Sequence, residues 1–155
     1  MPYLIDGHNL IPKVGLRLDS PDDEMELVAI LREFARLKRQ QVEVYFDGAP
    51  IGQAGTRNLG IVRTHFVKLG QTADNAIRTR LNKMDKNAKN YIVVSSDREV
   101  QSAARVFHAQ FISSENFVKL IKNVINSTSK ASTEDKKLSS TEVDEWLNLF
   151  RDKGN

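Results

Sequence analysis

The sequence has 155 residues, of which 40% are hydrophobic, and this size and composition predict one globular domain with a short appendage. It contains no cysteine, which excludes disulfides and thiolate metal sites. The formal net charge is +3, with the positive excess before residue 127, which suits a polyanionic partner without requiring one. Because we find neither signal-peptide features nor an apolar run of about 20 residues, we expect a soluble, cytoplasmic protein.

Short segments rich in β-branched and aromatic residues alternate along the chain with longer segments of helical periodicity. This alternation is typical of an α/β fold in which helices cover a parallel sheet. The predicted strands are residues 2–5, 42–46, 61–67, 91–95 and 109–112. The predicted helices are residues 22–40, 73–84, 97–107 and 115–125.

Two helix starts carry capping signals, and the C-terminal part of the chain changes in composition. Ser96 and Glu99 fit a capping box, and Thr72 is placed to cap the helix that follows it. Residues 127–140 are polar and of low complexity, which predicts a linker. We therefore divide the chain into a domain at residues 1–126, a linker at 127–140 and an amphipathic helix at 141–155, whose apolar face carries Val143, Trp146, Leu147 and Phe150.

Acidic residues follow the predicted strands. Asp6 and Asp47 come directly after the first two strands, Asp97 follows the fourth, and Asp74 follows the third after a short turn. The carboxyl ends of parallel strands share one edge of the sheet, where ligands of α/β proteins usually bind. Like charges at one edge raise one another's pKa unless a cation neutralises them, and oxygen-only ligands suit Mg²⁺ or Mn²⁺.

Each of these residues also has an ordinary structural interpretation. Asp6 and Asp47 precede glycines and fit simple turns, while Asp74 and Asp97 fit first helical turns, where a carboxylate complements the helix dipole. Thr72 and Ser95 each lie two residues before an acid, where a hydroxyl either orients a carboxylate or caps a helix. Asn9 either holds the acidic loops together or forms an Asx-turn.

The histidines and serines give weaker indications. His8 is a candidate general base but is more typical of a loop or partner-contact residue, and neither His65 nor His108 has an obvious acidic partner in the sequence. Ser95 and Ser96 lack the glycine-flanked elbow of serine hydrolases. The first strand is not followed by a dinucleotide or Walker motif, which argues against a nucleotide-cofactor enzyme.

The segments IDGHNLI, VYFDG, TADNAI and VVSSDREV, in this order, resemble the YacP-like NYN domains of the PIN-like nuclease superfamily over residues 2–125. The resemblance implies a PIN-like three-layer sandwich with a mainly parallel sheet of about five strands. It also implies a metal-dependent endoribonuclease, with some relatives acting on ribosome-associated messenger RNA. Carried over by position, Asp6, Asp74 and Asp97 match the metal-binding acids and Asp47 matches the acid after the second strand. Supporting polar positions match Asn9, Thr72 and Ser95.

The sequence departs from the family pattern at one position, and it contains one glycine-rich loop. The residue after the TAD acid is often acidic in relatives but is Asn75 here, which lowers the local negative charge. A divalent ion at these acids would activate water on a phosphodiester, so no protein nucleophile is needed. Residues 48–60 are glycine-rich and form either a mobile lid, with Arg57 on phosphate, or a flexible strand connection. The candidate substrate-binding side chains are Thr72, Ser95, Ser96, Arg57 and Arg78.

Two alternatives to the nuclease stay open. One is a non-catalytic RNA-binding or ribosome-binding module of the same fold. The other is a phosphohydrolase of small phosphate esters, which would favour an Asp-x-Asp motif that this sequence lacks after its first strand. A basic run leads away from Asp74 and predicts either contact with the backbone of a single RNA strand or a solvated helix face; it comprises Arg78, Arg80, Lys83, Lys86 and Lys89.

Overall fold

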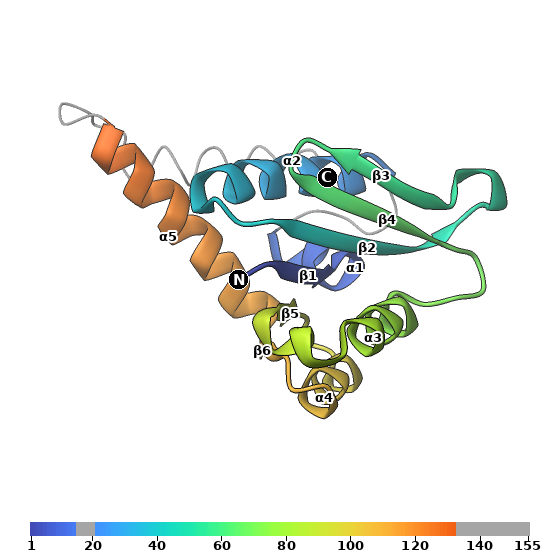
Figure 1. The fold of residues 1–155 in the computed structure, drawn as a ribbon. Coiled ribbons are helices and arrows are strands. Elements are labelled where there is room, and N and C mark those ends of the chain that lie inside the picture. The colour runs from blue at the N-terminus through green and yellow to red at the C-terminus, as the bar shows by residue number, and fades with distance from the viewer. Residues whose placement is uncertain (15–20, 133–155) are drawn as a thin grey trace.

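The computed structural model describes residues 1–14 and 21–132 and contains a six-stranded sheet in the order β3-β4-β2-β1-β5-β6. Four neighbouring pairs are parallel, and only β3 runs antiparallel, to β4 (Figure 1). The α/β class and the mainly parallel sheet are thus confirmed. The strands are β1 (Tyr3–Asp6), β2 (Val42–Ala49), β3 (Gly55–Leu59), β4 (Val62–Lys68), β5 (Ile92–Val94) and β6 (Gln110–Ile112).

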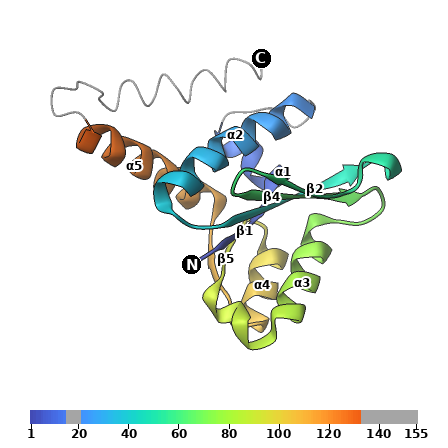
Figure 2. The ribbon, with the colours of Figure 1, turned by 45° about the horizontal axis from the view of Figure 1, so that its top comes forward.

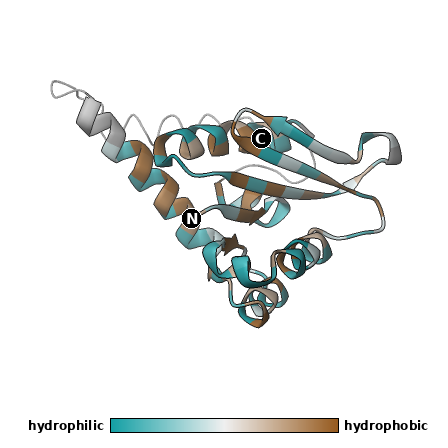
Figure 3. Cartoon of the chain, in the orientation of Figure 1, coloured by the Kyte–Doolittle hydropathy of each residue, from teal (hydrophilic) through white to brown (hydrophobic). Residues whose placement is uncertain are grey.

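Helices cover both faces of the sheet and make three layers. The helices α2 (Pro21–Lys38) and α5 (Ser114–Ser132) lie on one face, and α3 (Ala73–Met84) and α4 (Arg98–Val106) lie on the other (Figure 2). Strands buried on both faces need continuous apolar sequence, which explains runs such as those of β1 and β5. Figure 3 shows the matching apolar stretches along β2 and α5.

Each face of the sheet has its own hydrophobic core. On the side of α2 and α5, the rings of Tyr3, Phe34 and Phe117 meet with centroids 5.1 to 5.4 Å apart and join both helices to β1. On the side of α3 and α4, Leu4 and Ile77 are fully buried. Burial of each such side chain stabilises the fold by about 1.5 to 3 kcal/mol, so both helical layers are anchored to the sheet.

The four helices predicted between residues 22 and 125 all exist, but α5 runs further than expected. It continues to Ser132, beyond the predicted end at residue 125, so the first residues of the predicted linker are helical. Polar residues such as Asn126 and Ser127 extend this helix because its buried first half has already nucleated it. The rest of the linker and the helix predicted at 141–155 lie outside the described residues. No helix in the described ranges is long and apolar enough to cross a membrane.

The sequence analysis missed several short elements. Asp6 leads directly into α1 (Gly7–Leu10) and a 3-10 turn at Ile11–Val14, and further 3-10 turns lie at Ile51–Gln53 and Asp85–Asn90. The glycine-rich segment 48–60 is not wholly a lid or a flexible connection, because residues 55–59 pair with β4 as strand β3. The hairpin closes through Gly60 and Ile61, and Gly60 adopts the positive φ of 67° that such a tight turn requires.

Candidate active site

The predicted acids lie around the carboxyl edge of the parallel strands. Asp6 ends β1, Asp97 is the N-cap of α4 after β5, and Asp74 lies in the first turn of α3. The second strand does not end before Asp47 as predicted, since β2 continues to Ala49 across a register shift between Phe46 and Ala49. Asp47 therefore projects from an irregular strand end.

The glycine after Asp6 is required by packing. A Cβ atom at Gly7 would lie 2.3 Å from a ring carbon of Phe46 and 2.9 Å from the carbonyl oxygen of Tyr45. Real Cβ atoms essentially never come so close, so the chain can turn from β1 into α1 against β2 only through glycine. This close turn brings the residues after Asp6 onto the same edge as Asp47.

Asp6 is the most perturbed carboxylate of the edge. Burial raises its pKa, the charges of Asp47 and Asp97 add to this, and hydrogen bonding from Ser95 only partly offsets it, so that the pKa is about 6. The Ser95 hydroxyl donates to Asp6 Oδ2 at 3.3 Å. The predicted effect of crowded carboxylates is therefore present at Asp6, on which the charges of Asp47 and Asp97 both act.

Asp47 is held by a histidine and a helix start. Its Oδ1 atom lies 2.9 Å from His8 Nδ1, and its Oδ2 atom accepts from the backbone N–H of Ala73 at 3.2 Å. The other ring nitrogen of His8 lies 2.6 Å from Glu24 Oε2. Hydrogen bonding to Glu24 raises the pKa of His8 despite burial, with Asp47 adding to the rise, so the imidazolium form is favoured between two carboxylates.

Asp74 is paired with an arginine of its own helix. Arg78, one helical turn later, donates from Nε to Asp74 Oδ1 at 3.0 Å and from Nη2 to the backbone oxygen of Glu99 at 3.3 Å. Thr72 caps the same helix by accepting from the Asn75 N–H at 3.1 Å, as one of its two interpretations predicted. Contact of Arg78 with substrate stays a prediction.

The loop after β5 is organised differently from the predicted capping box. Asp97, rather than Ser96, caps α4 by accepting from the Glu99 N–H at 2.8 Å. Ser95 accepts from the Asp97 N–H at 3.0 Å while donating to Asp6, so it joins two of the acids. Ser96 instead donates to Glu115 at the start of α5. An acid that follows a serine competes for the N-cap position, and here the acid occupies it.

Asn9 joins the loops of the edge. Its Oδ1 atom accepts from the Ser96 N–H at 2.8 Å and from the Ser114 hydroxyl at 2.6 Å. The amide thereby connects the segment after β1 with the segments after β5 and β6. This arrangement agrees with the first of the two interpretations of Asn9, in which it holds the loops together.

The basic side chains of the prediction do not form one surface. Arg80 donates twice to the buried carboxylate of Glu43, at 3.2 and 2.9 Å, whereas Lys83, Lys86 and Lys89 are exposed. The guanidinium of Arg57 lies over the ring of Phe66, 5.0 Å from its centroid, and is exposed. Charge reversal at Arg80 would therefore disrupt a buried ion pair as well as any RNA contact.

Three acidic residues were not predicted from the sequence, and two of them bind histidines. Glu24 binds His8, Glu115 binds Ser96 and Lys13, and Glu43 binds His65, for which no acidic partner had been found. The role of Glu43 could have been predicted, because a glutamate inside the apolar run of β2 needs a polar partner when it is buried. The contacts of Glu24 and Glu115 could not have been predicted, since acids are common in first helical turns.

The fit of a divalent cation was tested on these donors. In residues 1–14 and 21–132, no three His, Asp or Glu side chains are positioned to hold a metal ion together. Mg²⁺ nevertheless keeps several waters and is usually bound by one or two carboxylates with substrate phosphates. Asp6, with its raised pKa beside Asp47 and Asp97, supplies oxygen donors of that kind, so the donor chemistry fits a hard cation.

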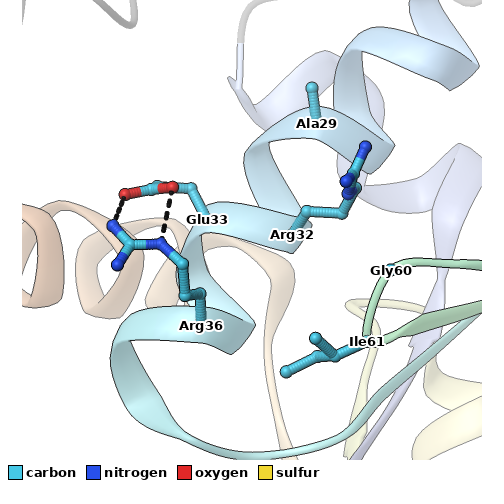
Figure 4. A pocket seen from close by; sticks show the side chains of 6 residues that line it. All are labelled: Ala29, Arg32, Glu33, Arg36, Gly60 and Ile61. Atoms are coloured by element: carbon cyan, nitrogen blue, oxygen red, sulfur yellow. Dashed lines mark hydrogen bonds and ion pairs between the residues drawn. The ribbon is translucent and has the colours of Figure 1, made fainter.

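A pocket of about 280 Å³ lies away from these acids (Figure 4). It is formed by the outer side of α2 and the β3–β4 turn, where Arg32 packs against Gly60. Arg36 in its wall is held by Glu33 through an ion pair on the same helix. The lining residues are Ala29, Arg32, Glu33, Arg36, Gly60 and Ile61, none of which is a candidate site residue.

Comparison with known proteins defines the class. The model of the YacP-like NYN domain matches residues 3–151, so the chain belongs to this family, whose fold is of the nuclease type. The match extends past the segments that first suggested it and includes the predicted linker and much of the C-terminal segment.

Two solved structures of Rae1 (YacP) from Bacillus subtilis have the same fold. The first has a TM-score of 0.66 at 19% identity and covers 99% of this chain and 93% of the other. The second, a mutant form, has a TM-score of 0.65 at 20% identity and covers 98% and 96%. No curated protein gives a match.

Proposed function

We propose that this protein is a divalent-metal-dependent endoribonuclease that cleaves single-stranded RNA at the carboxyl edge of its sheet. The observation that carries the proposal is the placement of Asp6 at the carboxyl end of β1, where the Ser95 hydroxyl donates to it and where burial, with the charges of Asp47 and Asp97, raises its pKa to about 6. A carboxylate whose charge is disfavoured in this way is stabilised by a cation. Membership of a family with a nuclease-type fold supports the same reaction class.

The residues have separate roles in this proposal. Asp6, Asp47, Asp74 and Asp97 would hold Mg²⁺ or Mn²⁺, which supplies phosphodiester polarisation and an activated water. Ser95 orients the Asp6 carboxylate, and Asn9 fixes the loops that carry the acids. The side chains proposed to contact substrate are Thr72, Ser95, Ser96, Arg57 and Arg78.

RNA is the proposed partner, and ribosome-bound messenger RNA is the form that the family resemblance implies. The mild positive charge of the chain supports a polyanionic substrate. His8 limits the negative charge of the edge, because its favoured imidazolium lies between Asp47 and Glu24. Phosphate can thus approach acids that are partly neutralised before any ion binds.

The test is cleavage of end-labelled single-stranded RNA with Mg²⁺ or Mn²⁺, with EDTA in excess, and with Asp97→Asn. We expect internal cleavage that requires the metal and is lost in the variant, whereas nucleoside monophosphates stay intact. Release of phosphate from the monophosphates would instead indicate a phosphohydrolase of small esters. Cleavage by Asp97→Asn at the wild-type rate, in nuclease-free preparations, would refute the assignment.

A non-catalytic RNA-binding or ribosome-binding module is the second candidate. The ion pair between Asp74 and Arg78 favours it, because this acid is already partnered, and no three acidic or histidine side chains of the described residues are placed for a metal. Such a module would bind RNA equally well with and without EDTA and would leave it intact. The same labelled RNA measures both properties.

A further inference from the structure

Glu43 is a buried carboxylate that the proposed reaction does not use. It is the second residue of β2, with 7% of its side chain exposed, and lies on the sheet face that α3 covers. Arg80 of α3 donates to both of its oxygens, and His65 Nε2 of β4 lies 3.0 Å from Oε1. The Tyr45 hydroxyl donates to Oε1 at 3.2 Å. One carboxylate therefore holds three side chains.

Stability alone does not account for this cluster. A buried ion pair costs much of its attraction in desolvation, so an apolar group of similar volume is often as stable. Burial would raise the pKa of Glu43, but hydrogen bonds from His65 and Arg80 outweigh it and lower the pKa to about 2, so the residue is fully charged. Its definite effect is to fix the positions of His65 and Arg80.

Both of these side chains reach the surface. The side chain of Arg80 is 32% exposed and that of His65 is 20% exposed. The His65 ring is stacked on Tyr45, with centroids 4.4 Å apart and planes 12° from parallel, and its Nδ1 atom lies 3.0 Å from the Thr56 hydroxyl. A planar ring and a guanidinium are thus held in fixed orientations beside solvent.

The β3–β4 hairpin continues this surface. Its two faces differ, because Leu59, Val62 and Phe66 pack in the core beneath α2, whereas the alternate residues point to the side of α3. On that side Thr56, Asn58 and Arg63 are exposed. Among the strands, α3 packs on β2 and β1 rather than on β3 and β4, so it leaves this face of the hairpin open (Figure 1).

The surface leads to the candidate active site. Asp47 lies four residues after Glu43 on β2, which is about 13 Å along a strand, and it binds the first turn of α3. The groups of the surface thus line one side of the route between the hairpin and the acids. Arg63 has no ion pair with any described residue, so its charge is available to a ligand.

We propose that Arg63, His65 and Arg80, the last two held by Glu43, form the surface that binds the strand of single-stranded RNA leading to the acidic edge. This inference rests on the proposed function and names the part of the chain that holds its substrate. Arginines bind phosphates, and a planar ring beside them offers a stacking partner to a base. The fixed positions lower the ordering cost of binding.

The first test measures binding of a single-stranded oligonucleotide over a range of salt concentrations, in the Asp97→Asn background to prevent cleavage. Arg63→Gln should weaken binding several-fold and lower the slope of log K against log salt by about 0.7. The matched control is Arg32→Gln, which removes another exposed arginine charge, on the outer side of α2 (Figure 4). Equal losses in both variants would show that binding follows net charge and would overturn the proposal.

The second test asks whether RNA binding depends on the fixed positions of Arg80 and His65 or only on the net charge of the protein. Glu43→Met raises the formal charge from +3 to +4, because one of the 20 acidic residues is removed. A surface that acts through charge alone would then bind RNA more tightly. We expect weaker binding, since Arg80 and His65 lose their common anchor, at a temperature where circular dichroism shows the variant folded. Tighter binding would overturn the proposal, and Arg63→Gln tests it independently if Glu43→Met does not fold.

The outcomes also separate this inference from the proposed function. If the wild type cleaves RNA and Arg63→Gln binds and cleaves like the wild type, the proposed RNA-binding surface is wrong and the nuclease assignment is kept. If the wild type binds RNA through Arg63 without cleaving it, the proposed surface is kept and the nuclease assignment is wrong. If the wild type does not bind RNA at all, both are wrong.

Discussion

Asp6 and Glu43 are carboxylates on neighbouring strands of one sheet, the first partly and the second almost fully buried, yet their pKa values move in opposite directions. The pKa of Asp6 rises to about 6 and that of Glu43 falls to about 2. Burial is the largest influence on each and raises both. The difference lies in the partners, since Glu43 meets Arg80 and His65, whereas Asp6 meets a serine hydroxyl and the charges of Asp47 and Asp97.

The comparison separates a satisfied charge from an unsatisfied one. Glu43 has the Arg80 cation and a hydrogen-bonding histidine within the chain, so its environment is complete without a ligand. Asp6 is partly buried beside like charges, and this arrangement costs stability. Such arrangements are kept in proteins where function requires them. A divalent ion would supply Asp6 with the compensating positive charge that Arg80 supplies to Glu43. The following predictions test whether this difference in partners is also a difference in role.

The largest expected effect is on catalysis. Asp97→Asn keeps the size of the side chain but removes one of the charges acting on Asp6, and the rate of RNA cleavage should fall by at least about 100-fold, beyond the loss typical of residues that only support metal ligands. Asp6→Asn should cost as much, and the double variant little more, because ligands act as a unit. Single-turnover cleavage of labelled RNA measures this. Additive losses would contradict a shared ion.

The next largest effect is on stability at the satisfied carboxylate. Arg80→Met leaves Glu43 buried with only His65 and Tyr45 as hydrogen-bond partners, and the free energy of unfolding should fall by about 2 to 3 kcal/mol. Urea unfolding measures it. The control is Arg63→Gln on the same face, which should change stability by less than about 0.5 kcal/mol. An unchanged stability in Arg80→Met would show that solvent already compensates Glu43.

The sequence was sufficient for the layers of this fold and for the positions of its acids. Periodicity located all four long helices, and strands such as β1 are apolar runs that only a covered sheet explains. The acids follow because the carboxyl ends of parallel strands share an edge. The strand β3 was missed since GTRNL is polar and glycine-led, and its pairing with β4 overrides weak local propensity.

The partners of the acids could not be predicted in the same way. The contacts of Glu24 with His8 and of Glu43 with His65 join residues 16 and 22 positions apart, and their geometry depends on how α2 and β4 pack. The N-cap of α4 was placed one residue early, because serine and aspartate both cap well and the chain path decides between them. Local rules give candidates, and packing selects among them.

A smaller effect of opposite sign is expected at Asp6. Its pKa is about 6 in the folded protein against 3.8 for an ordinary aspartate, so below the lower value both states are protonated and the residue has no effect. As the pH rises, the unfolded chain loses its proton first, so the folded state becomes disfavoured; the penalty grows until about pH 6 and stays constant above it, at about 1 to 3 kcal/mol. Asp6→Asn should therefore increase stability at pH 7.5 and leave it unchanged near pH 3.5. Urea unfolding at both values checks this, and a loss of stability at pH 7.5 would contradict it.

The smallest effect is the stabilisation by metal, which completes the comparison. An ion that binds only the folded state raises the free energy of unfolding by RT ln(1 + [L]/Kd), which is about 1 kcal/mol at five times Kd. Millimolar Mn²⁺ or Mg²⁺ should therefore raise the melting temperature slightly, and EDTA should reverse the change. Zinc should not replace them, because the acids offer only oxygen ligands. Asp6→Asn should abolish the shift, whereas Arg80→Met should retain it, because Glu43 has no part in the ion site. A shift of equal size in all three proteins would place the ion elsewhere and remove the reason for treating Asp6 as an unsatisfied ligand.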